Sequence, residues 1–198
     1  QLTQADEWLA RIPPNADPLK VASRRAALLA QQGRKSDGLK LLEQVKVNNP
    51  QDARLKALAI SQWLREDKQI NAALTIIEQA LAKFPADTDL QSEMAMLCEK
   101  LGRFDQMESI LRGLMKAKPN DAHAFNALGY SLADRNIRLN EARELILKAV
   151  QLAPRDPFIQ DSLGWVAFRQ GQHAELEQHA AGGLEPANLL HVPERTVG

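Results

Sequence analysis

The sequence of 198 residues lacks several features that commonly reveal a function. It contains a single cysteine, Cys98, so an internal disulfide is excluded. Lys plus Arg and Asp plus Glu each number 25, and this balance excludes the overall positive field by which proteins collect nucleic acid or anionic membranes. No run approaches the roughly 18 consecutive apolar residues that cross a bilayer. We therefore expect no nucleic-acid partner and no membrane insertion by this segment.

Motifs for catalysis, metals and phosphates are also missing. The four histidines are scattered, and His173 and His179 do not share one helical face, so no zinc site is expected. The segment that starts at Gly33 lacks the second glycine of a phosphate-binding loop. The serines fall on helix faces set by the repeat described next, and Cys98 falls at a core position of that repeat. We predict a protein that is not an enzyme and holds no cofactor.

What the sequence does contain is a repeat. Its 44% hydrophobic and 25% charged residues are typical of a folded protein with a buried core. Prolines recur with gaps of 35, 34 and 35 residues, at Pro50, Pro85, Pro119 and Pro154. Each is followed two positions later by an aspartate, and an earlier aspartate begins the series: Asp17, Asp52, Asp87, Asp121 and Asp156. Because proline cannot continue a helix and aspartate caps the next one, each pair predicts one helix end and one helix start.

Each period contains two stretches with apolar residues at helical spacing. Glycines mark three of the turns between them, at Gly33, Gly102 and Gly171. The other two turns lack glycine, and the intervals Trp63 to Ala73 and Leu132 to Ala142 predict one extra residue in each. The second helix of each pair carries core positions seven residues apart, at Gly38 and Val45, Ala73 and Ala80, Met107 and Leu114, and Ala142 and Ala149.

These patterns predict eleven helices in four segments. Residues 1–14 contain the second helix of a truncated preceding repeat, and residues 15–171 contain four complete hairpins and the first helix of a fifth. Residues 172–183 form an atypical closing helix, and residues 184–198 form a tail outside the repeat. Two interpretations of the tail compete: a flexible end, or an extended segment that docks on apolar surface and supports self-association.

The residues of the fourth complete hairpin carry a specific resemblance. They place a large residue, Leu-Gly, an apolar residue, two alanines and a closing proline in register, at Phe125, Leu128, Gly129, Leu132, Ala142, Ala149 and Pro154. This pattern resembles the tetratricopeptide repeat. The resemblance implies an all-α fold, a right-handed superhelical solenoid of helix-turn-helix hairpins. Residues 122–171 are also similar to large multi-repeat proteins of the proteobacterial cell envelope, which favours a periplasmic or outer-membrane-associated location, with the cytoplasm as the alternative.

The resemblance also implies a concave groove lined by the first helix of each hairpin. The residue after each Leu-Gly glycine position then faces the groove, at Ala27, Ser61, Met96, Tyr130 and Trp165. The predicted partner-binding residues are Tyr130, Trp165, Asn126, Asp134, Asp161, Phe158, Phe168, Arg169, Met96 and Arg65. Rigid aromatic side chains beside hydrogen-bonding groups are typical anchors of peptide recognition. Core packing is the competing interpretation for Phe168 and Trp165, whereas the Tyr130 hydroxyl favours an exposed position.

The expected function is that of a scaffold which binds an extended or helical segment of a partner protein in its groove. Self-assembly and service as the recruiting arm of a larger enzyme are the alternatives. Charged residues also lie along the predicted groove, with Arg54 and Arg65 before Asp89 and Glu93 in the chain. One interpretation is that these charges simply keep the surface solvated. The alternative is a bipolar groove, which would orient a partner by its charges.

Overall fold

The computed structural model describes residues 17–171, which form nine α-helices. In chain order they are α2 (Pro18–Gln31), α3 (Lys35–Gln44), α4 (Pro50–Glu66), α5 (Ile70–Lys83), α6 (Thr88–Lys100), α7 (Phe104–Ala117), α8 (Ala122–Asp134), α9 (Leu139–Leu152) and α10 (Pro157–Arg169). The chain divides into two compact units, the first ending at Met107 and the second starting at Glu108, so the boundary falls inside α7. The helices predicted between residues 18 and 170 are confirmed.

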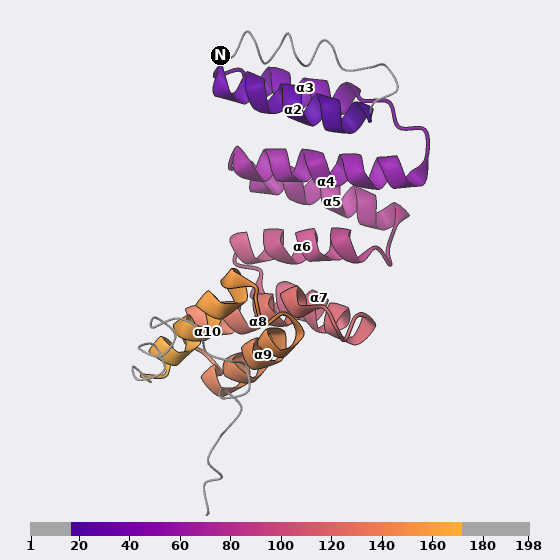
Figure 1. Cartoon of the computed structure of the whole chain (residues 1–198). Helices are drawn as coiled ribbons and strands as arrows, with labels where there is room; N and C mark the ends of the chain where they lie inside the picture. Colours follow the sequence, from indigo (N-terminus) through magenta and orange to yellow (C-terminus); the bar gives the residue numbers. More distant parts are fainter. Residues whose placement is uncertain (1–16, 172–198) are drawn as a thin grey trace, which may run out of the picture. The chain divides into compact units, whose positions relative to one another are not determined.

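The first unit is built from helical hairpins. Helix α2 packs on α3 and helix α4 packs on α5, while contacts of α3 with α4 and of α5 with α6 join successive pairs, as Figure 1 shows. The core lies along these contacts and contains Ala26, Leu42, Leu64, Ile77, Leu90 and Leu97. Each hairpin therefore buries its apolar stripe against its neighbours, as expected for a repeat that cannot form a core alone.

In the second unit, α8 and α9 form a hairpin, and α10 packs against both. Its fully buried side chains include Leu128, Leu132, Ile146, Ile159, Leu163 and Val166. Gly129 lies at the closest approach of α8 to α9, since a Cβ at this position would stand 2.9 Å from the Ala142 carbonyl oxygen. Glycine thus permits the contact that brings α8 and α9 together.

Aspartate caps four of the five first helices, as predicted. The side chains of Asp17, Asp87, Asp121 and Asp156 each accept hydrogen bonds from two backbone amides at the start of the following helix. These bonds satisfy amide groups that have no partner within the helix. Pro18 and Pro157 follow their caps directly, at positions where a missing N–H costs nothing.

The prediction that Asp52 is a cap is wrong. Helix α4 begins at Pro50, and the capping residue is Asn49, whose Oδ1 accepts from the Asp52 amide at 2.8 Å. The Asn49 Nδ2 group donates back to the Asp52 carboxylate at 2.8 Å, so the two side chains form a reciprocal cap. Pro50 occupies the first helical position instead of ending the preceding helix. The asparagine before the proline was the signal in the sequence.

The turn between α4 and α5 is no longer than the others, contrary to the prediction. After the α2–α3 turn, the Arg34 amide donates to the Leu29 carbonyl oxygen at 2.8 Å. After the α4–α5 turn, the Gln69 amide donates to the Leu64 carbonyl oxygen at 2.8 Å, again across five residues. Leu64 is therefore the equivalent of Leu29, so the length of the turn follows from the interval between Leu64 and Ala73 rather than from that between Trp63 and Ala73. The Trp63 ring instead lies over Gly38, 2.5 Å from where a Cβ would be. The extra residue in the α8–α9 turn is real and includes Arg138 in a left-handed conformation with φ 47°.

Left-handed backbone occurs at the corresponding position of every turn. Gly33, Gly102 and Gly171 have φ between 70° and 77°, and Lys68 and Asn136 occupy the same position with φ 62° and 57°. This conformation strains residues with a Cβ, although asparagine tolerates it better than lysine. The two turns without glycine therefore keep the backbone geometry of the glycine turns at an energetic cost.

Replacing Lys68 by glycine should stabilise the fold. Lys68 is exposed, so little contact is lost, and relief of the left-handed strain should raise the free energy of unfolding by about 0.5–1 kcal/mol. Asn136→Gly is the matched control and should give a smaller gain. Urea denaturation of the three proteins measures both effects, and a loss of stability in Lys68→Gly would contradict the strain at this position.

The buried positions seven residues apart are confirmed with one exception. Ala73, Met107, Leu114, Ala142 and Ala149 are all 0–1% exposed. Val45 is not on its helix, because α3 ends at Gln44 and Val45 is the half-buried residue after it. The segments predicted at residues 1–14, 172–183 and 184–198 lie outside the described residues, and the handedness of the whole array stays a prediction.

Candidate functional site

Helices α8 and α10 pack together and present two equivalent rows of side chains. Asn126, Tyr130 and Asp134 are spaced by four on α8, and Asp161, Trp165 and Arg169 repeat these positions 35 residues later on α10. The Arg169 Nη2 group donates to the Asp134 carbonyl oxygen at 3.1 Å and joins the two rows. We call these six residues, with Phe158 and Phe168, the α8/α10 face. Eight of the ten predicted partner-binding residues belong to it.

Aromatic side chains dominate the α8/α10 face. Tyr130 is 39% exposed, Phe168 46% and Phe158 79%. The half-buried Trp165 ring stacks on Phe168, with centroids 5.5 Å apart and an interplanar angle of 22°. The Arg169 guanidinium lies 5.4 Å from the centroid of the Trp165 ring. Trp165 and Phe168 are therefore not simply core residues, because the pair reaches the surface.

Three polar atoms of the face have unmet hydrogen-bonding capacity. The Trp165 Nε1 group, the Asn126 Oδ1 atom and the Arg169 Nε group are buried and have no hydrogen-bond partner in the part of the chain that the structure describes. A buried polar atom without a partner costs about 1–3 kcal/mol. Such costs are concentrated where a protein has a function to perform.

Asp134 and Asp161 bring negative charge to the same face. Both residues are exposed, and neither forms an ion pair within residues 17–171. Asp134 is the last residue of α8, where the helix dipole disfavours a carboxylate. Helix stability therefore does not explain why an aspartate stands there.

The remaining two predicted residues lie in the first unit. Met96 on α6 is 40% exposed, in agreement with an accessible position. The Arg65 side chain is 23% exposed and pairs with Glu93 at 3.2 Å. Their role in binding stays a prediction.

Ser61 was assigned to the accessible column, and this assignment is wrong. Ser61 is fully buried, and its Oγ donates to Glu93 Oε1 at 2.8 Å. The exposed residue at this level of α4 is Gln62, because the register of α4 is set by Leu64. The wrong assignment of Ser61 and the wrong length of the α4–α5 turn have one cause: α4 was aligned with the other repeats on Trp63 instead of Leu64.

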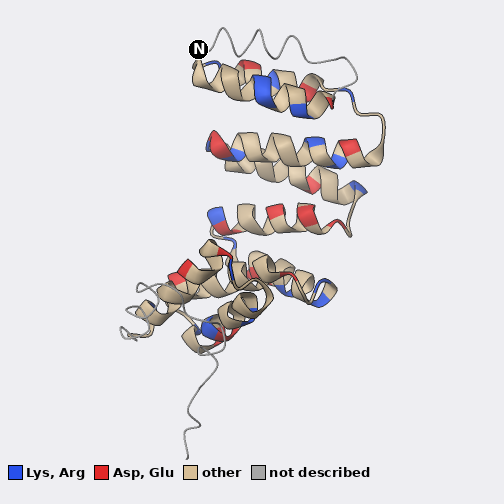
Figure 2. Cartoon of the chain, viewed as in Figure 1, with Lys and Arg blue, Asp and Glu red and all other residues tan. Residues whose placement is uncertain are grey.

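Charges in the first unit are paired between neighbouring repeats. Arg54 on α4 contacts Asp87 at 3.3 Å and Asp89 at 2.6 Å, and the hydrogen bond to Asp89 is the main cause that raises the pKa of Arg54. Figure 2 shows that Lys and Arg are interspersed with Asp and Glu along the helices. These pairings and the Arg65–Glu93 pair argue against a bipolar groove, because the basic residues of α4 form ion pairs with the acidic residues of the next repeat.

Comparison with known proteins agrees with this architecture. The family model for the tetratricopeptide repeat matches residues 64–129. A TPR repeat-containing protein of Pseudomonas aeruginosa is 38% identical over 180 residues, which cover 91% of this chain and 30% of the relative. The chain is an array of tetratricopeptide repeats.

Other proteins are similar to parts of this chain. The peroxisomal targeting signal receptor of Candida albicans is 32% identical over 98 residues, which cover 50% of this chain and 16% of the receptor. Among solved structures, MamA of Desulfovibrio magneticus has a TM-score of 0.61 at 21% identity and covers 84% of this chain and 93% of its own. A tetratricopeptide repeat protein of Parabacteroides merdae has a TM-score of 0.61 at 13% identity, with 82% and 64% covered. The structural likenesses show the fold.

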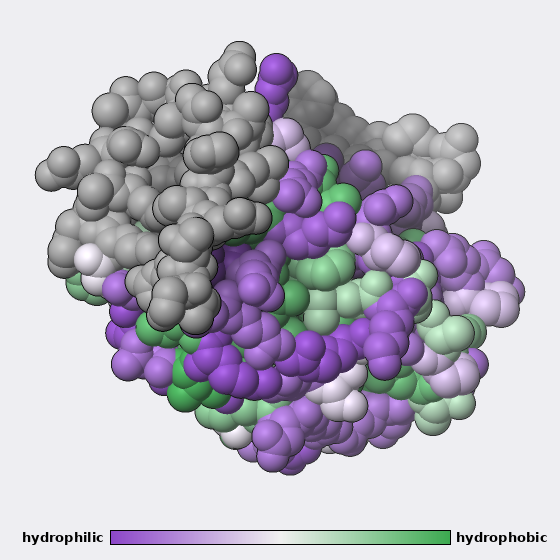
Figure 3. All heavy atoms as spheres, turned by 90° about the horizontal axis from the view of Figure 1, so that it is seen from below, coloured by the Kyte–Doolittle hydropathy of each residue, from purple (hydrophilic) through white to green (hydrophobic). Residues whose placement is uncertain are grey.

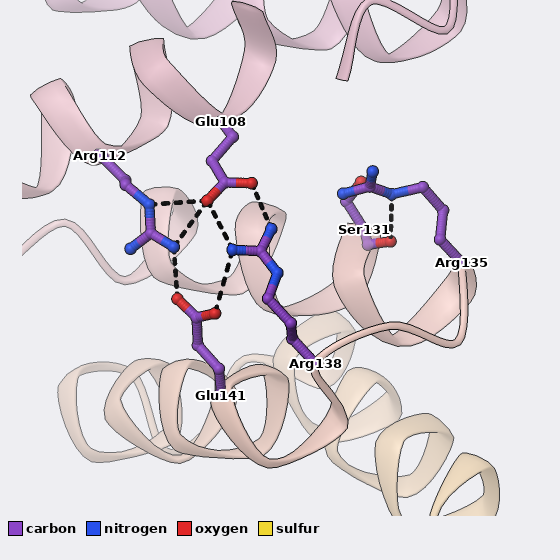
Figure 4. Close-up of polar contacts among 6 residues, drawn as sticks. All are labelled: Glu108, Arg112, Ser131, Arg135, Arg138 and Glu141. Carbon is purple, nitrogen blue, oxygen red and sulfur yellow. Dashed lines mark hydrogen bonds and ion pairs between the residues drawn. The ribbon is translucent and has the colours of Figure 1, made fainter. Parts of the chain in front are cut away.

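A ring of charges in the second unit was missed by sequence reasoning. Glu108 and Arg112 on α7, Arg138 in the α8–α9 turn and Glu141 on α9 alternate in sign, and each contacts two neighbours, as Figure 4 shows. The hydrogen bond from Arg138 is the main cause that lowers the pKa of Glu108 to about 2. The left-handed Arg138, which no sequence pattern indicates, brings its guanidinium to both carboxylates.

Cys98 is fully buried, and burial raises the pKa of its thiol, which keeps the sulfur neutral and poorly nucleophilic. Residues 17–171 bring together no group of three His, Cys, Asp or Glu side chains suited to a metal ion. Within the same range, no helix has the length and apolarity required to cross a membrane.

Proposed function

We propose that this array is a protein-interaction scaffold and that the α8/α10 face receives a segment of a partner protein. The helical-hairpin architecture supports a role in binding. The observation that supports the proposed site is the concentration of exposed aromatic side chains, Tyr130, Phe158 and Phe168, around the half-buried Trp165. Aromatic anchors supply much of the binding energy at protein interfaces.

The surface of the molecule mixes hydrophobic and hydrophilic side chains. Figure 3 shows hydrophobic surface in separate patches between hydrophilic side chains, where the grey residues leave that side of the molecule visible. Mixed surfaces of this kind allow a partner to bind through apolar anchors with a polar rim. The Trp165–Phe168 stack and the Arg169 contact hold the indole in place, so little side-chain entropy is lost when a partner binds.

Substitution of the anchors tests the proposal. We expect Tyr130→Ala and Trp165→Ala each to weaken partner binding by about 2 kcal/mol, roughly thirty-fold, as for other aromatic hot spots. The control is Ile137→Ala, which removes an apolar side chain of equal exposure, 40%, in the α8–α9 turn. Proteins captured by the immobilised chain are identified by mass spectrometry, and their affinities are then measured by calorimetry.

Folding and self-association are checked in parallel. Circular dichroism should show the helical content of the parent chain in all three variants. If the two anchor variants are folded and keep every partner at full affinity, the proposed site is wrong. Light scattering across a concentration series distinguishes partner binding from self-assembly, for which the proposed segment, residues 184–198, lies outside the described residues.

A further inference from the structure

The α8/α10 face carries carboxylates that the fold does not engage. Four of the acidic residues are engaged within the fold: Glu108 and Glu141 belong to the charge ring, and Asp121 and Asp156 cap helices. Within residues 108–171, Asp134, Glu144 and Asp161 have no such role, and two of these three carboxylates, those of Asp134 and Asp161, lie on the face that carries the exposed aromatic side chains.

Arg169, the cation on this face, does not neutralise either aspartate. Its guanidinium lies over the Trp165 ring, 5.4 Å from the centroid. Its Nη2 group donates to the backbone carbonyl of Asp134, not to the carboxylate. Arg169 forms no ion pair within residues 17–171, so both aspartate carboxylates remain available to a ligand.

The two carboxylates stand at different levels of the face. Asp161 repeats the position of Asn126, two turns of helix before the level that Asp134 shares with Arg169. The aromatic pair of Tyr130 and Trp165 lies between these levels. A ligand that contacts the aromatic side chains therefore passes one carboxylate on each side.

We infer that the segment bound by the α8/α10 face is a cationic amphipathic peptide, and this inference rests on the proposed function. Its apolar side chains contact Tyr130, Trp165 and Phe168, and its Lys or Arg side chains pair with Asp134 and Asp161. The exposed aromatic rings also attract cations through their faces. An acidic segment of the same shape is disfavoured, since it would bring like charges together on the face.

A selection from random twelve-residue peptides displayed on phage tests the inference without knowledge of the partner. The full chain is the bait, and the Tyr130→Ala/Trp165→Ala double variant is used for counter-selection. We expect the peptides that require the two aromatic residues to be enriched in Lys and Arg next to apolar residues. Peptides that require these residues but are neutral or acidic would overturn the inference and leave the proposed function in place.

Charge variants then test the two contacts directly. For a selected peptide, fluorescence anisotropy should show that Asp134→Asn and Asp161→Asn each weaken binding by about two- to five-fold, as for partly exposed ion pairs. Glu144→Gln removes an exposed carboxylate of α9 and should leave the affinity unchanged. The dependence of the affinity on NaCl should be weaker in the double aspartate variant than in the parent chain.

The results of these experiments distinguish the inference about the charge of the peptide from the proposed binding site. Equal affinities in the parent chain and both aspartate variants, all folded by circular dichroism, would overturn the inference. If the selection yields no peptide that requires Tyr130 and Trp165, the proposed site fails and the inference fails with it.

Discussion

Gly129→Ala should destabilise the protein, although alanine normally stabilises a helix relative to glycine. A Cβ at position 129 would lie 2.7 Å from Ile146 Cγ1 and 2.9 Å from the Ala142 carbonyl oxygen. The carbonyl belongs to the backbone of α9, so α8 and α9 must move apart. Overpacking of this kind costs about 1–3 kcal/mol. We expect the loss to exceed the gain in helix propensity, which is about 1 kcal/mol.

A larger side chain should make the effect larger. Gly129→Val adds two methyl groups at the same contact, and we expect its free energy of unfolding to fall by several kcal/mol, about the upper end for core overpacking. The α8/α10 face is built on α8, so partner binding should decrease as the hairpin loosens.

Gly113→Ala provides the matched control. Gly113 also lies within a helix, α7, and a Cβ there would meet nothing within 4 Å. This variant should be stabilised by about 0.5–1 kcal/mol, because only helix propensity changes. Urea denaturation followed by circular dichroism measures all three variants. Stabilisation of Gly129→Ala equal to that of Gly113→Ala would show that the predicted clash does not occur.

The sequence pattern predicted Gly129 as a repeat position, and the structure gives the physical reason. Burial repeats with the period at the positions of Gly129, Ala142 and Ala149, because each hairpin packs its two helices together there, and small residues occupy the position where the two backbones approach most closely, as at Gly129. Aspartate caps were predictable for the same reason, since every first helix needs partners for its initial amides. A structural requirement that recurs in every hairpin therefore appears in the sequence as a periodic residue pattern.

Features that depend on the individual hairpin do not follow from the period. Asn49, not Asp52, caps α4, so this helix starts earlier than the spacing of the other repeats indicates, and the asparagine before Pro50 was the local signal for it. Trp63 was taken as the residue before the turn, whereas its ring packs over Gly38 of the neighbouring hairpin. Contacts between hairpins involve residues far apart in sequence, and a single sequence contains no signal for them.

The sequence predicted which residues form the α8/α10 face but not how their side chains are arranged. The repeat period placed Tyr130 and Trp165 at equivalent positions, and the resemblance implied that these positions are accessible. The stack of Trp165 on Phe168 and the hydrogen bond from Arg169 to the Asp134 carbonyl depend on rotamers, which the period does not specify. Their geometry shows that Arg169 leaves both carboxylates unpaired.

The charge ring should make the second unit sensitive to acid. Because the pKa of Glu108 is lowered to about 2 from its ordinary value of 4.5, its carboxylate stabilises the folded state above pH 4.5. This contribution is lost as the pH falls from 4.5 towards 2. The shift alone corresponds to about 3 kcal/mol, but Arg112 and Arg138 are 40% and 43% exposed, so we expect about 1–2 kcal/mol after solvent screening.

Glu108→Gln isolates this contribution, because glutamine keeps the shape of the side chain without its charge. Between pH 5 and 7, the variant should be less stable than the parent chain by the full 1–2 kcal/mol, roughly the value expected for the ring. The difference should shrink steadily between pH 4.5 and 2, and it should also shrink when NaCl is raised at neutral pH. Glu144→Gln, which removes an exposed charge outside the ring, should show little change at any pH. A stability difference for Glu108→Gln that persists unchanged at pH 2 would mean that packing of this side chain, not its charge, holds α7 to the α8–α9 turn.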